Sequence, residues 1–98
     1  MSESSDARPP ELARLRDEIE HVDRAIIELI SKRVVLARQV GATKKEAGLP
    51  TLDHAREAAV VRRAIDVARE AGLAFEDEVR QIFWQLIGLC RRAQTHDD

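Results

Sequence analysis

Cysteine is almost absent from the chain, and this excludes two kinds of small protein. Cys90 is the single cysteine among 98 residues, so no disulfide can form within the chain and no cluster of cysteines can bind zinc. Aromatic residues are also rare, at 3% of the sequence against 44% for hydrophobic residues as a whole. A hydrophobic core must therefore be built from Leu, Ile, Val and Ala side chains.

The chain also lacks the charge excess and the long apolar runs that mark nucleic-acid-binding and membrane proteins. Its formal net charge is only −2, so any positively charged site has to be local. No apolar run approaches the roughly 20 residues that cross a bilayer. The first ten residues are polar and have no hydrophobic segment typical of a secretory signal. We therefore expect a cytoplasmic protein with neither nucleic acid nor membrane as a partner.

Proline and glycine are scarce too, and their positions predict a very long first helix. Residues 11–47 contain no proline and a single glycine, Gly41. This stretch predicts one helix of about 36 residues, or ~54 Å at 1.5 Å per residue. Gly48 can take the left-handed conformation that caps a helix, and Pro50 cannot continue one. The helix should therefore end between Ala47 and Pro50.

Two shorter helices are predicted after it. Asp53 is a good N-cap residue, and the helix that follows it should stop at Gly72. The third helix opens with acidic residues at 76–78, which suit a helix N-terminus, and runs to about Gln94. No segment shows the alternation of a strand. The prediction is an all-α fold of three helices, divided as follows: a flexible tail at 1–10, one domain at 11–94 and a flexible tail at 95–98.

The length of the first helix predicts a second copy of the chain. A compact domain of this size has a radius of gyration of only ~13 Å, so a helix of ~54 Å extends beyond its own fold. Much of the apolar face of that helix would then stay uncovered. We expect an intertwined homodimer in which the two long helices pack against each other.

Two cations interrupt the apolar stripe of the long helix. Apolar residues recur at steps of three and four, as on one helix face, at Leu12, Leu15, Ile19, Val22, Ile26 and Leu29. Arg33 takes the next position in this rhythm, and the stripe resumes and then reaches Lys44. Eleven residues return to nearly the same face, so the two cations lie about 16 Å apart along one side. Either one alone could extend its charged head to solvent; two on one stripe indicate a positively charged cavity.

The other two helices add a carboxylate and an amide to apolar faces. Glu57 lies one turn before Val61 in the second helix, and in the third helix Gln94 ends a row formed by Phe83, Ile87 and Cys90. Buried charges are costly unless they are paired, and only one internal acid faces the two cations. The surplus positive charge predicts an anionic ligand. Arginine in particular suits a carboxylate or phosphate bound through two hydrogen bonds.

The sequence has none of the residue patterns of nucleophilic, metal or phosphate-loop chemistry. There is no Ser-His-Asp arrangement, no pair of histidines with metal-ligand spacing and no glycine-rich loop. The three histidines, at 21, 54 and 96, are expected at the surface. Chemistry in the predicted cavity would have to proceed by positioning and electrostatics.

Three segments of the chain resemble the all-helical AroQ class of chorismate mutase. They are LRDEIEHVDRAIIELISKRVVLARQVGATK (15–44), LPTLDHARE (49–57) and IFWQLIGLCRRAQ (82–94), and the resemblance spans roughly residues 11–94. The family's functional residues fall at Arg16, Arg33, Lys44, Asp53, Arg56, Glu57 and Gln94.

The resemblance implies a reaction that needs no cofactor or metal. An intertwined homodimer would rearrange chorismate to prephenate, on the way to phenylalanine and tyrosine. Because the rearrangement is intramolecular, the enzyme has to hold the flexible enolpyruvyl arm over the ring. It also has to stabilise the negative charge that builds on the ether oxygen as the C–O bond breaks.

The same resemblance assigns the groups that bind the carboxylates and the ether oxygen. Arg33 and Arg16 of the partner subunit would bind the two carboxylates. Lys44 and Gln94 would donate hydrogen bonds to the ether oxygen, and Lys44 could also contact a carboxylate. Arg16 precedes Arg33 by seventeen residues, or about 25 Å along a straight helix, so a second chain is the natural way to bring the two together.

The remaining assignments concern the ring and the walls of the site. Glu57 would accept a hydrogen bond from the ring hydroxyl, helped by the backbone at Asp53. Arg56 would support a carboxylate from a greater distance. Cys90 would face a substrate carboxylate; since a thiol is a weak donor, it either donates weakly or forms only part of the wall.

Two alternative interpretations remain at this stage. An isochorismate-pyruvate lyase or a 4-amino-4-deoxychorismate mutase would use the same fold, because Glu57 favours a hydroxyl group but can also accept from an amine. The chain could instead be a non-catalytic helical dimerisation module that binds a partner enzyme of the aromatic pathway. Such a module would have no reason to keep Arg33, Lys44 and Glu57 on inner faces.

Overall fold

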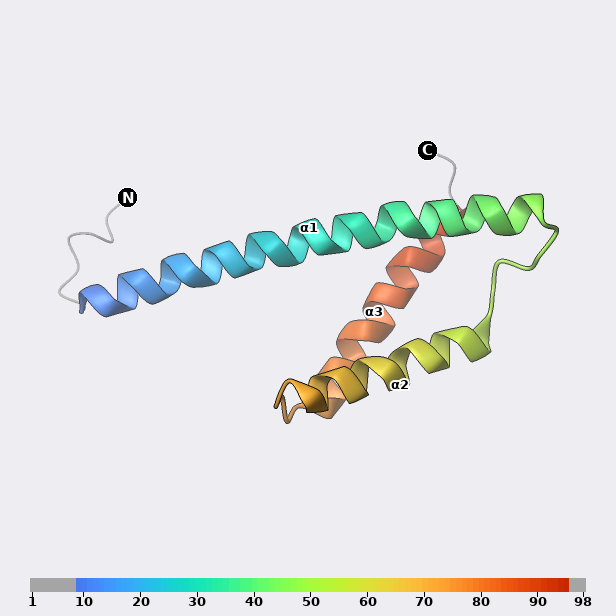
Figure 1. The fold of residues 1–98 in the computed structure, drawn as a ribbon. Helices are drawn as coiled ribbons and strands as arrows, with labels where there is room; N and C mark the ends of the chain where they lie inside the picture. The colour runs from blue at the N-terminus through green and yellow to red at the C-terminus, as the bar shows by residue number, and fades with distance from the viewer. Residues whose placement is uncertain (1–8, 96–98) are drawn as a thin grey trace. The chain divides into compact units, whose positions relative to one another are not determined.

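Three α-helices form the described part of the chain, residues 9–95 of a computed structural model (Figure 1). α1 spans Pro10–Glu46, α2 spans His54–Glu70 and α3 spans Glu76–Thr95. The predicted all-α fold with one very long first helix is confirmed, and the predicted helix ends agree to within about two residues. No helix in residues 9–95 is both long and apolar enough to cross a membrane. Of the predicted tails at 1–10 and 95–98, only positions 9, 10 and 95 belong to the described residues. His96 lies outside them.

Caps and glycines set the helix ends where the sequence predicted them. The Asp53 Oδ1 atom accepts a hydrogen bond of 3.0 Å from the backbone N–H of Arg56 and so caps the N-terminus of α2. Gly48 and Gly72 follow α1 and α2 with φ angles of 70° and 77°. This left-handed conformation costs glycine little and lets the chain leave each helix.

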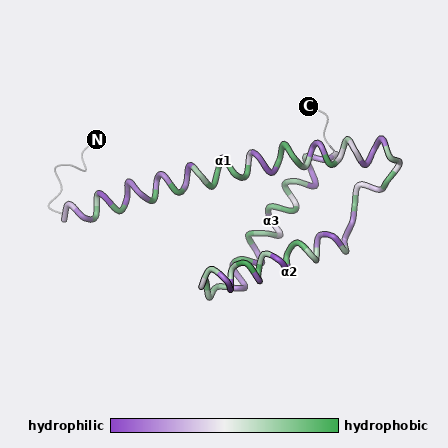
Figure 2. Tube along the Cα trace, in the orientation of Figure 1, coloured by the Kyte–Doolittle hydropathy of each residue, from purple (hydrophilic) through white to green (hydrophobic). Residues whose placement is uncertain are grey.

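The chain divides into two units, residues 1–31 and 32–98, and α1 runs from the first into the second. In the first unit the described residues are Pro9 and the part of α1 that runs to residue 31. Hydrophobic and hydrophilic positions alternate along this helix (Figure 2). The predicted apolar stripe is exposed here, with 43% to 64% of each residue accessible to solvent at Leu15, Ile19, Val22, Ile26 and Leu29. A contiguous exposed apolar surface is typical of an interaction site.

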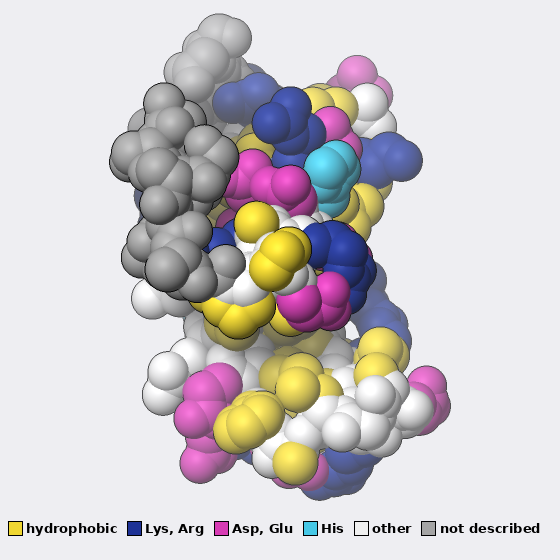
Figure 3. All heavy atoms as spheres, turned by 90° about the vertical axis from the view of Figure 1, so that its left-hand side faces the viewer, with side chains coloured by type: hydrophobic (Ala, Val, Ile, Leu, Met, Phe, Trp, Pro, Cys, Tyr) yellow, Lys and Arg dark blue, Asp and Glu magenta, His cyan; other side chains and the backbone are white. Residues whose placement is uncertain are grey.

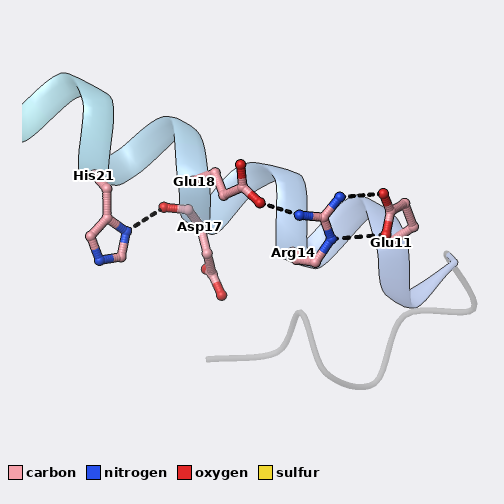
Figure 4. Close-up of polar contacts among 5 residues, drawn as sticks. All are labelled: Glu11, Arg14, Asp17, Glu18 and His21. Carbon is pink, nitrogen blue, oxygen red and sulfur yellow. Dashed lines mark hydrogen bonds and ion pairs between the residues drawn. The ribbon is translucent and has the colours of Figure 1, made fainter.

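Polar contacts on this segment join residues one helical turn apart (Figure 4). Arg14 forms ion pairs with Glu11 and Glu18. The Nδ1 atom of His21 lies 2.8 Å from the backbone oxygen of Asp17. These side chains are exposed, as expected for His21, and such local pairs support a helix without adding a core.

In the second unit, α2 and α3 pack around an aliphatic core. Val61 and Ile65 of α2 and Ile87 of α3 form its buried cluster, and Val60 packs against them. The scarcity of aromatic residues predicted such a core. Hydrophobic side chains also reach the surface where α2 and α3 join (Figure 3), and this end includes Leu73 and Phe75, which are 45% and 60% exposed.

The C-terminal part of α1 passes very close to α3 at Gly41. A Cβ atom on Gly41 would lie only 2.8 Å from the backbone oxygen of Gln94 and 3.0 Å from its Cα atom. One turn earlier on α1, Ala37 is buried. The two helices therefore meet backbone to backbone, which explains a glycine inside a long helix, where it otherwise costs about 1 kcal/mol relative to alanine.

Replacing Gly41 with alanine should destabilise the domain, because the new methyl group collides with the backbone of α3. The expected cost is roughly 1–3 kcal/mol in the free energy of unfolding, as for other overpacked sites. Gly88 in α3 provides a matched control, since a Cβ atom there meets only the Nη1 atom of Arg92 at 3.6 Å. Gly88→Ala should be neutral or stabilising by up to about 1 kcal/mol. Equal stability of the two variants in urea unfolding would contradict the close crossing at Gly41.

Candidate functional site

A cleft of about 480 Å³ opens within the second unit and is lined by residues of all three helices. Its apolar lining consists of Leu36, Ala37, Val40, Val60 and Ile87. Its polar lining comes from α1 (Arg33 and Lys44), from the start of α2 (Asp53, Arg56 and Glu57) and from the last turns of α3 (Cys90, Arg91 and Gln94). This volume and this mixture of groups suit a small organic molecule with several polar substituents.

The cleft brings together seven of the eight residues that the sequence singled out: Arg33, Lys44, Asp53, Arg56, Glu57, Cys90 and Gln94. They come from segments that are up to about 60 positions apart, so the fold assembles them. The eighth residue, Arg16, belongs to the other unit, where it is exposed on α1. It is not among the residues that line the cleft.

Arg33 is half-buried in the cleft and has an uncharged partner. Its Nη1 atom donates a hydrogen bond of 2.9 Å to the Sγ atom of Cys90, which is only 4% exposed. A thiol is a weak acceptor and supplies no counter-charge. Within residues 9–95 no carboxylate pairs with Arg33. Cys90 therefore acts here as the group that holds the guanidinium, a role that the sequence did not suggest.

Lys44 is held in the same way by uncharged acceptors. Its Nζ atom donates to the backbone oxygen of Thr51 at 2.8 Å and to the Oε1 atom of Gln94 at 3.2 Å. Because an ammonium group can only donate, the amide oxygen of Gln94 has to face Lys44. The amide NH2 group of Gln94 is then left to donate to another acceptor.

Glu57 is paired with Arg91, to which the sequence analysis assigned no role. The Nε and Nη2 atoms of Arg91 donate to the two carboxylate oxygens at 3.0 and 2.6 Å, and the Nδ1 atom of His54 lies 3.6 Å away. The hydrogen bonds from Arg91 are the main cause that holds the pKa of Glu57 below its usual value of 4.5, against the opposing effect of desolvation. Glu57 is therefore ionised at neutral pH.

The helical spacing of the sequence alone indicates that Arg91 can face the site. This residue follows Ile87 by four positions and precedes Gln94 by three, so it borders the apolar stripe of α3. The signal was weak because Arg91 is followed by another arginine, Arg92, which is exposed. Only the packing of α2 against α3 distinguishes the two.

The cleft has a surplus of positive charge. Four cations line it, and two acids: Arg33, Lys44, Arg56 and Arg91 against Asp53 and Glu57. Glu57 offsets Arg91, whereas the hydrogen-bond partners of Arg33 and Lys44 among the described residues are uncharged. In the part of the chain that the structure describes, no group of three or more His, Cys, Asp or Glu side chains is arranged to hold a metal ion. The arrangement can bind a small molecule with about two negative charges.

A comparison with protein families shows to which family the chain belongs. Residues 15–95 match the model of chorismate mutase type II. The chain belongs to the chorismate mutase type II family. The resemblance to the AroQ class that three sequence segments indicated is thereby confirmed.

The curated relatives of this chorismate mutase domain differ in length. A 3-dehydroquinate dehydratase of Pyrobaculum aerophilum is 36% identical over 83 residues, which cover 85% of this chain and 24% of the relative. An intracellular chorismate mutase of Mycolicibacterium smegmatis is 36% identical over 72 residues, which cover 74% of this chain and 68% of the relative. The chain spans about a fifth to a quarter of the length of the first four curated relatives it matches.

A solved structure shares both the fold and part of the sequence. It is a conserved hypothetical protein of Pyrococcus furiosus, 34% identical, with a TM-score of 0.71 over 89% of this chain and 99% of that chain. The three-helix arrangement of this chorismate mutase domain therefore recurs in a separate protein.

Proposed function

We propose that this domain catalyses the rearrangement of chorismate to prephenate in the cleft formed by α1, α2 and α3. The observation that carries the proposal is the pair Arg33 and Lys44, two half-buried cations whose hydrogen-bond partners in the cleft are uncharged. Chorismate brings two carboxylates to such a site. Its charge offsets the surplus that the protein leaves uncompensated.

The rearrangement breaks the ether C–O bond and forms a C–C bond within one molecule, so the protein gains and loses no atoms. Arg33 binds one carboxylate and holds the enolpyruvyl arm over the ring. Lys44 and the NH2 group of Gln94 donate to the ether oxygen, on which negative charge develops. The contact between Lys44 and the amide oxygen of Gln94 supports this role, because it leaves that NH2 group available.

Groups on α2 and α3 bind the rest of the substrate in this proposal. Glu57 accepts a hydrogen bond from the ring hydroxyl, which agrees with its ionised state. The backbone at Asp53 assists, and Arg56 supports a carboxylate from a greater distance. Cys90 forms a wall of the site and holds the guanidinium of Arg33.

The site is completed, in the same proposal, by Arg16 of the partner subunit in an intertwined homodimer. The exposed apolar stripe between Leu15 and Leu29 supports a second chain as its cover. A mainly apolar groove of about 520 Å³, lined mostly by α2 and α3 and also by Arg33 of α1, includes Val67 and Ile82 and offers a further surface of this kind. We place the enzyme in the cytoplasm, in line with the relative that is named an intracellular chorismate mutase.

Arg33→Ala should lower the turnover of chorismate by about a hundredfold or more, since the substrate loses both a carboxylate ligand and its orientation. Chorismate disappearance is followed by ultraviolet absorbance, and the product is checked as phenylpyruvate after acid treatment. Arg62→Ala, an exposed arginine of α2, should leave turnover unchanged. Absence of turnover by the folded wild-type dimer would reject the proposal, and parallel assays with isochorismate and 4-amino-4-deoxychorismate would then test the two related reactions.

Gln94→Glu should convert a flat pH profile into a falling one. An amide donates at any pH, so wild-type activity should change little between about pH 6 and 8. A carboxyl group donates only while protonated, and each pH unit above its pKa lowers the protonated fraction about tenfold. The profile of kcat over this range measures the difference. A wild-type profile that falls as steeply as that of the variant would exclude Gln94 as the donor to the ether oxygen.

Mixing two inactive variants should restore part of the activity if Arg16 acts across the dimer. Arg16→Ala and Arg33→Ala each remove one group from both sites. After mixing, unfolding and refolding, half of the dimers contain one of each chain, and one of their two sites is intact. Activity should therefore recover to about a quarter of the wild-type value. Mixtures that stay as inactive as the separate variants would show that Arg16 does not act in trans.

A further inference from the structure

We propose that Arg91 is a positioning residue that makes the site prefer a substrate with a ring hydroxyl over one with a ring ammonium group. It does so by fixing the Glu57 carboxylate and offsetting its charge through a bidentate ion pair. The inference rests on the proposed function above and concerns the substrate class of that site.

The geometry of the pair leaves Glu57 able to bind a substrate. The Nε and Nη2 atoms of Arg91 each engage a different carboxylate oxygen, at 3.0 and 2.6 Å. Such a planar fork fixes the orientation of the carboxylate as well as its position. Every carboxylate oxygen can accept more than one hydrogen bond, so Glu57 can still accept from a substrate donor. Glu57 is only 15% exposed, whereas Arg91 is 38% exposed.

The charge balance decides which donor Glu57 accepts best. His54 on its own helix lies 3.6 Å away, Arg91 faces it from α3, and Arg33 and Lys44 line the same cleft from α1. Without Arg91, the Glu57 charge would oppose the entry of a dicarboxylate. With Arg91, the pair is neutral overall and a neutral hydroxyl suffices as its donor. A ring ammonium group would instead be repelled by the nearby guanidinium.

The test compares two substrates on matched variants. Arg91→Met keeps most of the side-chain length but removes the charged guanidinium group and its two hydrogen bonds. Arg92→Met makes the same change of residue type at the exposed neighbouring position. We expect Arg91→Met to lower kcat/KM for chorismate by roughly ten- to a hundredfold. The ratio of kcat/KM for 4-amino-4-deoxychorismate to that for chorismate should rise at least about tenfold. Arg92→Met should change neither. Arg91→Lys keeps the charge without the bidentate geometry, so its preference ratio should stay closer to that of the wild type than the ratio of Arg91→Met.

An unchanged preference ratio in Arg91→Met would overturn the inference, because a merely structural loss lowers both activities equally. Far-ultraviolet circular dichroism and thermal unfolding of all variants show whether the fold is retained. If Arg91→Met fails to fold, Arg91→Gln, which removes the charge but keeps a polar side chain, decides the question: a raised ratio supports the inference, and an unchanged ratio overturns it.

A titration that needs no turnover separates this inference from the proposed function. The carboxyl carbon of Glu57, labelled with ¹³C, is titrated by NMR in the wild type and in Arg91→Met. Loss of the Arg91 hydrogen bonds should raise the pKa of Glu57 toward its usual value of 4.5. An unchanged titration shows that Arg91 does not hold Glu57 and overturns the inference. If the wild type fails to convert chorismate, the proposed function fails, and the titration still decides whether Arg91 holds Glu57.

Discussion

Arg33 and Lys44, two cations that have no counter-ion among residues 9–95, are the constraint on which the rest of this structure depends. Both lie half-buried in a cleft with a partly aliphatic lining, and within residues 9–95 their hydrogen-bond acceptors are a thiol, a backbone carbonyl and an amide oxygen. Burying charge without an opposite charge costs free energy. A site that binds an anion has to accept this cost, because an internal carboxylate beside each cation would compete with the ligand. The aliphatic packing of α2 against α3 has to supply the stability that the cleft lacks.

The long helix α1 serves the site through its regular spacing. Arg33 and Lys44 lie three turns apart on one face, and Gly41 lies between them where α3 crosses. A larger residue at position 41 would push away the last turns of α3, which contain Gln94. Glycine at this position lowers the intrinsic stability of the helix, but it allows the close approach that sets the distance between the ammonium group of Lys44 and the amide of Gln94. The packing of the helices and the geometry of the polar groups are therefore fixed by the same contact.

Much of the fold was predictable from local sequence signals. Asp53, Gly48 and Gly72 set helix ends because caps depend on neighbouring residues alone. The polar interruptions of apolar stripes also indicated which side chains face inward. Periodicity gives the face of a residue but not its partner, so the pairing of Glu57 with Arg91 and of Arg33 with Cys90 was missed. Both pairs join residues more than 30 positions apart and depend on how the helices pack. The assembly of two chains stays a prediction for the same reason, since it depends on contacts beyond one chain.

The hydrogen bonds that Lys44 already forms determine which of its donors an arriving anion can use. An ammonium group has three N–H donors, and two of them already bind Thr51 and Gln94. The third is left for a ligand, together with the donors of Arg33 that do not bind Cys90. An anion can therefore bind without breaking a protein contact. The side chains that receive it are ordered when the chain folds, so the entropy of ordering them is lost during folding and not during binding.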